Sequence, residues 1–280
     1  MLAPAPSLLQ RIRTGVRLAL CAVALLAATG CKMMAPSNAR NWQPDQTQLA
    51  FAIYQGEHVQ VHNIRNCQYL AADEYVLDYY DKTLDLRKLQ TVDFIVVPFD
   101  NMPQLAHTML SFGFEDGYHL CLSVEIRREE GESYAAWKGG LRQYELMYVL
   151  GDERDLIQLR TNHRGESVYL YRSRATPEQA RALFVDVIDR VNKLYREPEF
   201  YDTLTNNCTT NLVRHINRLQ PHRVPYNYQV LLPGHSDRLA YNLGLLDTTA
   251  SFEETKRRAY INPRAQQVAG HPDFSTLIRR

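Results

Sequence analysis

The sequence has little charge imbalance, no internal repeat and no long hydrophobic run after its first thirty residues. Lysine and arginine together number 32 and aspartate and glutamate 31, so the formal net charge is +1. Nucleic-acid-binding proteins usually present a strongly basic surface, and this balance argues against such a partner. No segment beyond residue 30 approaches the ~20 apolar residues of a membrane-spanning helix. The remaining 250 residues suffice for one large globular core.

Cysteine is also scarce, with five in 280 residues. Two of them lie in the first 31 residues, which leaves Cys67, Cys121 and Cys208. Three is an odd number, so in an oxidising compartment at least one thiol stays unpaired within the chain. Either Cys67 pairs with Cys121, or Cys121 is an ordinary buried residue in a strand.

The first thirty residues have the pattern of an export signal. A basic start precedes an unbroken apolar run over 18–28, which is too short to span a bilayer and typical of a signal-peptide core. Ala28-Thr29-Gly30-Cys31 resembles a bacterial lipobox, and a plain cleavable signal peptide is the alternative. We expect a signal peptide over 1–30, lipid on Cys31, a tether over 31–41 and a folded domain from Trp42. Lys32 after Cys31 predicts sorting to the outer membrane.

The first part of the domain is rich in predicted β-strands. Alternating or β-rich segments predict strands at 58–64, 93–99, 109–114, 118–127, 144–150 and 168–171. Glu115-Asp116-Gly117 suits a three-residue hairpin loop. That loop length places His107 opposite Glu125, whereas a change of one residue would move Glu125 to the other face.

The second part is predicted to be helical. Thr176 is placed as an N-cap, Pro177 as the first helical residue and Gln179 at the capping-box position, so a long helix begins here and stops before Pro198. A second helix starts at Cys208 and ends before Pro221. The expected fold class is α+β, an antiparallel sheet packed by helices, with a helical or irregular C-terminal segment. Residues 259–280 are expected to be a loosely held tail.

Cys208 is the leading candidate for chemistry. It follows Asn206 and Asn207 at the start of a predicted helix, where the macrodipole and unpaired N–H groups favour a thiolate nucleophile. His107, on a predicted strand, is the candidate base, and Glu125 its candidate partner. The backbone N–H of Cys208 and the side-chain amide of Asn206 or Asn207 are candidate oxyanion donors. Histidine before cysteine is the order found in circularly permuted papain-like enzymes, and a buried structural cysteine is the alternative.

The chain resembles the Lnb N-terminal periplasmic domain family. The similarity extends from about residue 42 to 258 and is strongest in the segments 106–112, 122–129, 144–149, 152–155, 159–162, 206–211 and 232–234. The resemblance implies a permuted, NlpC-related papain-like fold. It also implies a cysteine thioester that carries an acyl group toward a lipoprotein amino terminus, with the family's cysteine and histidine at Cys208 and His107. Acyltransferase members have further transmembrane segments, which this sequence lacks.

Three functions follow from these observations. The first is an envelope enzyme that acts on acyl esters of phospholipid or lipoprotein and is anchored through lipid on Cys31. The second is a peptidoglycan amidase of the NlpC type, and the third is a non-catalytic binding lipoprotein with the same fold. No cofactor is expected. No metal site is expected either, because His58 and His62 have no third ligand nearby.

Overall fold

The computed structural model describes residues 35–132 and 143–280, in which Ser37–Arg280 form one compact unit. The predicted signal peptide and Cys31 lie outside the described residues. The strands of this unit are β1 (Phe51–Gln55), β2 (His58–Arg65), β3 (Gln68–Ala71), β4 (Glu74–Val76), β5 (Tyr79–Asp85), β6 (Leu89–Phe99), β7 (Met102–Phe114), β8 (His119–Arg127), β9 (Glu145–Asp152) and β10 (Tyr169–Arg172). The helices are α3 (Glu153–Leu156), α4 (Pro177–Arg196), α5 (Cys208–Leu219), α6 (Tyr228–Leu231), α7 (Ser236–Asn242), α8 (Phe252–Ala259), α9 (Asn262–Gln267) and α10 (Phe274–Leu277).

The described strands build a mixed but mainly antiparallel sheet in the order β1-β2-β9-β8-β7-β6-β10, with β5 paired to β2. The predicted hairpin is β7–β8, and its register places Met109 opposite Ser123. Phe114 N–H donates to the Tyr118 carbonyl, which closes the loop as predicted. The contact between β2 and β9 is the parallel one.

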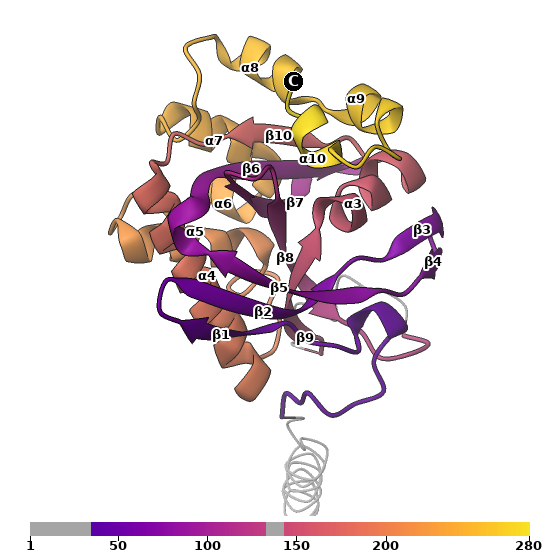
Figure 1. Cartoon of the computed structure of the whole chain (residues 1–280). Helices are drawn as coiled ribbons and strands as arrows, with labels where there is room; N and C mark the ends of the chain where they lie inside the picture. Colours follow the sequence, from indigo (N-terminus) through magenta and orange to yellow (C-terminus); the bar gives the residue numbers. More distant parts are fainter. Residues whose placement is uncertain (1–34, 133–142) are drawn as a thin grey trace, which may run out of the picture. The chain divides into compact units, whose positions relative to one another are not determined.

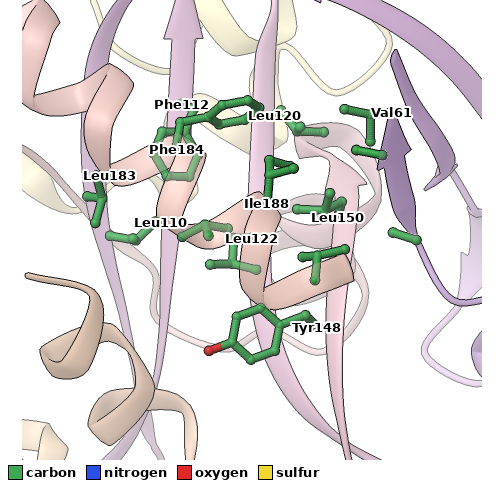
Figure 2. Close-up of a cluster of buried hydrophobic side chains, with 14 of the residues drawn as sticks. Val61, Leu110, Phe112, Leu120, Leu122, Tyr148, Leu150, Leu183, Phe184 and Ile188 are labelled. Carbon is green, nitrogen blue, oxygen red and sulfur yellow. The ribbon is translucent and has the colours of Figure 1, made fainter. Parts of the chain in front are cut away.

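Helices cover both faces of the sheet (Figure 1). On one face, α4 packs on a core that includes Leu110, Phe112, Leu122 and Phe184 (Figure 2). Cys208 and Leu212 of α5 belong to the same core. Because side chains alternate along a strand, the neighbouring residues lie on the opposite face of the sheet. There the C-terminal segment covers a second core, which includes Met109, Cys121, Met147, Phe274 and Ile278.

Both predicted long helices are present. Thr176 caps α4 and forms the full capping box with Gln179, and the helix stops before Pro198. Helix α5 begins at Cys208 and ends before Pro221. No helix among residues 35–132 and 143–280 has the length and apolar character needed to span a bilayer.

The structure differs from the expected domain bounds in two places. The compact unit includes residues 37–41, which the sequence places in the tether, because Asn38 donates to the Leu194 carbonyl at 3.1 Å and Arg40 pairs with Glu145 at 2.7 Å. Residues 259–280 are not a loose tail, since Ala265 and Ile278 are fully buried.

Candidate active site

Cys208 is the first residue of α5, and local hydrogen bonds fix the start of this helix. Asn207 accepts from Thr210 N–H at 2.8 Å, and the Thr210 hydroxyl accepts from Asn207 N–H at 2.9 Å. The Thr209 hydroxyl meets that of Thr108 on β7 at 3.1 Å. This capping box and the threonine contact hold the first turn of α5 against the sheet.

The sulfur lies against the strand that carries His107. Cys208 Sγ is 4.0 Å from the Ala106 carbonyl oxygen and 3.8 Å from the Thr209 hydroxyl, and Cys208 is 8% exposed. The backbone N–H groups of Cys208 and Thr209 find no acceptor in the described part of the chain. Unpaired N–H groups at a helix start favour negative charge, so an anion that develops beside the sulfur would be stabilised here.

His107 is held by a short polar chain on β8. His107 Nε2 is 2.7 Å from Ser123 Oγ, and the Ser123 hydroxyl donates to Glu125 Oε1 at 2.7 Å. A hydroxyl has one proton, so Ser123 Oγ accepts from His107 Nε2–H. The lone pair of the neutral ring is therefore on Nδ1, the state that a general base requires.

Sequence reasoning found the hairpin register but missed Ser123. The observed pairing continues the spacing that places His107 across from Glu125. Ser123 lies two residues before Glu125, so both side chains extend from the same face of β8. This two-residue spacing is the signal from which Ser123 could have been found.

Charged neighbours set the ionisation of this group. Burial, together with the Arg160 guanidinium, lowers the pKa of His107 to about 3. Burial raises the pKa of Glu125, but the guanidinium groups of Arg65 and Arg160 outweigh it and lower that pKa to about 2. Arg160 approaches Glu125 at 3.4 Å. Near neutral pH the site thus contains a neutral imidazole and an ionised carboxylate.

These shifts predict how stability depends on pH. The folded-state pKa of His107 lies below its ordinary value of 6.5, so between pH 6.5 and 3 the unfolded chain binds more protons at this residue. His107 therefore lowers the free energy of unfolding progressively as the pH falls through this window. We expect His107→Gln to flatten that part of the stability curve, measured by urea unfolding at several pH values. An unchanged slope relative to the parent protein would contradict the assigned ionisation.

Cys208 and His107 do not form a hydrogen bond in this structure. The Thr108 side chain points to α5, and side chains alternate along a strand, so the His107 side chain extends to the other face of the sheet. The pairing of β7 with β8 ends at Met109 and Ser123, so Ala106 and His107 have no paired residue on β8. The two predicted residues are therefore on adjoining elements and come near each other only through the β7 backbone.

Asn206 and Asn207 shape the loop before α5. Asn206 donates to the Phe200 carbonyl at 2.8 Å and accepts from Arg214 at 3.0 Å. Asn207 donates to the Thr203 carbonyl at 2.6 Å in addition to capping the helix. These bonds explain why a run of asparagines precedes Cys208, and the oxyanion role of their side chains stays a prediction.

Cys67, Cys121 and Cys208 are all free thiols. Burial raises the pKa of Cys67 to about 12 and also raises the pKa of Cys121, so neither is a ready nucleophile. Within residues 35–132 and 143–280, no three histidine, cysteine or acidic side chains gather as a metal site would require.

The acidic segment 152–155 combines a local ion pair with two buried carboxylates. Asp152 caps α3 and forms a local ion pair with Arg154. Glu153 and Asp155, in contrast, are fully buried against Arg279 and Arg65. Sequence reasoning missed both partners because each comes from a distant part of the chain.

A cavity of about 300 Å³ lies away from Cys208. Its lining includes Cys67, Tyr69, Arg154 and His271, between β3 and the C-terminal segment. It is therefore not a binding space for a substrate of the Cys208 thiol.

Cys208 thus lies at the start of a helix that packs on a mainly antiparallel sheet. Residues 75–234 match the family described as the Lnb N-terminal periplasmic domain. This match covers more than half of the chain, and the protein belongs to that family. Membership of a periplasmic domain family indicates the bacterial periplasm or envelope as its location. No curated protein and no solved structure matches the chain.

Proposed function

We propose that this protein is a cysteine-dependent acyltransferase or acyl hydrolase of the bacterial envelope. The observation that carries the proposal is Cys208, placed at the start of α5 beside two free N–H groups and against the strand that bears His107. Helix after sheet, with histidine before cysteine, suits the permuted papain-like arrangement. Its substrates would be acyl esters of phospholipid or lipoprotein, and lipid on Cys31 would keep the domain at the membrane, at the outer membrane if Lys32 directs sorting.

The chemistry needs two half-reactions. The Cys208 thiol gives its proton to His107 Nδ1 and the sulfur attacks the ester carbonyl carbon, while the N–H groups of Cys208 and Thr209 stabilise the oxyanion. The C–O bond then breaks, and the alcohol leaves with the proton from His107. An amine or water next attacks the thioester, its proton passes through His107 to the sulfur, and the acyl group leaves as an amide or acid.

This mechanism requires movement of His107. The ring binds Ser123 on one face of the sheet, whereas Cys208 packs on the other. Catalytic hydrogen bonds are often absent before substrate binds and form in the complex. The imidazole would have to reach the thiol beyond the end of the β7–β8 pairing, where His107 has no paired residue on β8.

Mass spectrometry of purified protein incubated with phospholipid tests the proposal. We expect a fatty-acyl adduct on the peptide that contains Cys208, released by neutral hydroxylamine as a thioester is. Cys208→Ser should remove the labile adduct and leave the circular dichroism spectrum unchanged. Cys67 is the internal control, because its buried thiol should stay unmodified in the same sample. Cleavage of peptidoglycan peptides without any acyl adduct would instead support an amidase.

A non-catalytic binding protein is the second candidate, favoured by one observation. Cys208 is 8% exposed and makes no hydrogen bond to His107. On this hypothesis the thiol only fills the core beside Leu212. Cys208→Ala would then leave every envelope phenotype of the protein intact. Loss of such a phenotype in a folded Cys208→Ala variant would exclude the non-catalytic hypothesis.

A further inference from the structure

An exposed apolar surface lies at the same end of the molecule as Cys208. We call it the apolar rim, and it consists of Phe99, Met102, Leu204, Tyr226, Tyr228 and Leu231. All six are exposed in the described structure, and none of them contributes to the cores. Isolated exposed apolar residues are common, but a contiguous group marks an interaction surface.

Several contacts bring together the segments that carry the apolar rim. Phe99 pairs with Met102 at the turn between β6 and β7. The short helix Pro233–His235, which follows α6, packs on the start of β7 so closely that a Cβ on Gly234 would come 2.0 Å from the Pro103 carbonyl. The Tyr226 hydroxyl donates to the Leu204 carbonyl at 2.6 Å and so joins the loop before Cys208 to the loop before α6.

The part of the apolar rim around α6 has a composition that fits a lipid surface. Residues 224–236 contain no aspartate, glutamate, lysine or arginine. Tyr226 and Tyr228 have the amphipathic rings that are enriched at membrane–water interfaces. Arg214 donates to the Thr205 carbonyl beside Leu204, and Arg223 directly precedes this segment. Their positive charge attracts anionic headgroups.

The position where the folded unit begins points to the same partner. Ser37 N–H donates to Glu145 at the first residue of β9. Strands β7 and β9 both pair antiparallel with β8, so they start at the same end of the sheet, and β7 starts at Met102 of the rim. Five residues lie between the predicted lipid site at Cys31 and Ser37, and the six Cα–Cα steps reach at most about 22 Å.

We propose that the apolar rim docks on the bilayer surface. Docking would bury the tyrosine rings and Leu231 at the headgroup boundary and turn the Cys208 end of the sheet toward the lipid. The inference does not depend on thiol chemistry. A folded Cys208→Ser variant should dock as well as the parent protein, so failure of either proposal can be told from failure of the other.

The test uses residues 37–280, which form one compact unit with their own cores. Sedimentation with vesicles of phosphatidylethanolamine and phosphatidylglycerol at 3:1 should pellet this protein. The double substitution Tyr228→Ser and Leu231→Ser should reduce the partition coefficient at least tenfold. Leu70→Ser with Val76→Ser on the β3–β4 hairpin is the matched control, because those side chains are 67% and 54% exposed, against 64% and 41% for the rim pair. The control should bind as the parent does.

Three results would overturn the proposal. The first is no binding of the parent protein to these vesicles, and the second is an equal loss in the hairpin control. The third is concentration-dependent self-association in analytical ultracentrifugation that the rim substitutions abolish, which would make a second copy the occupant. Circular dichroism of each variant verifies that lost binding does not come from unfolding.

Discussion

Arg279→Ala should unfold at a markedly lower temperature than the parent protein. Arg279 Nε is 2.8 Å from Asp93, one of its terminal nitrogens is 2.8 Å from Glu153, and both carboxylates are fully buried. Asp93 would keep its ion pair with Arg172 at 2.7 Å, but Glu153 would stay buried without its ion-pair partner, which costs about 3–5 kcal/mol. In a domain of this size that corresponds to a fall in Tm of roughly 6–20 °C.

The neighbouring residue provides the control for this experiment. Arg280 is exposed and its side chain binds none of these carboxylates, so Arg280→Ala should change the free energy of unfolding by less than about 0.5 kcal/mol. Adding Glu153→Gln to Arg279→Ala should restore part of the loss, since the buried charge that lost its partner is then removed. Equal stability of Arg279→Ala and Arg280→Ala would show that the C-terminal segment does not depend on this cluster.

His107→Ala should slow acylation of Cys208 by about 100-fold or more, the contribution expected of a general base. The rate can be measured from nitrophenolate release with p-nitrophenyl octanoate, together with the acyl adduct on the Cys208 peptide. Because the pKa of His107 is about 3, protonation of the imidazole should not limit this rate between pH 5 and 8. An imidazole base with the ordinary pKa of 6.5 would instead produce an inflection of the rate in that range.

Ser123→Ala separates a positioning role from a structural one. Ser123 does not face the reacting sulfur but holds Nε2 of His107, so its loss should leave the base free to adopt the other tautomer. We expect a several-fold loss of acylation rate and a shift in its pH dependence, with Ser123→Thr retaining most of the rate. If His107→Ala and Ser123→Ala both acylate at the parent rate, His107 is not the base.

The sequence was sufficient to predict those parts of the fold that depend on local patterns. The capping box at Thr176 and Gln179, the start of α5 at Cys208 and the register of the β7–β8 hairpin are all read from residues a few positions apart. Each depends on hydrogen bonds within one turn or one loop. Such features are specified by neighbours in sequence and were therefore accessible.

Features that depend on distant partners were not predicted. Arg279 lies 126 positions from Glu153, and Arg65 lies 90 positions from Asp155. A charged residue near a chain end is usually exposed, so the burial of 259–280 had no local signature. Strands β1 and β5 were missed because their exposed edge residues weaken the hydrophobic alternation.

The candidate site was predicted in its elements but not in its geometry. Residue type and the helix-start position singled out Cys208, and strand placement singled out His107. The face on which His107 lies follows from its odd or even position relative to Thr108, which contacts α5. Because the sequence does not say which of these neighbours meets the helix, the separation of the two side chains could not be foreseen.

The early end of the β7–β8 ladder has a kinetic consequence. Beyond Met109, strand β7 keeps its pairing with β6 but loses that with β8, so this stretch should open at lower free energy than the hairpin tip. A thiol–imidazole encounter would then be a minority conformer, and observed turnover would be scaled down by its fractional occupancy. A ligand that favours the conformer in which thiol and imidazole meet would thus accelerate the reaction without contributing any reacting group.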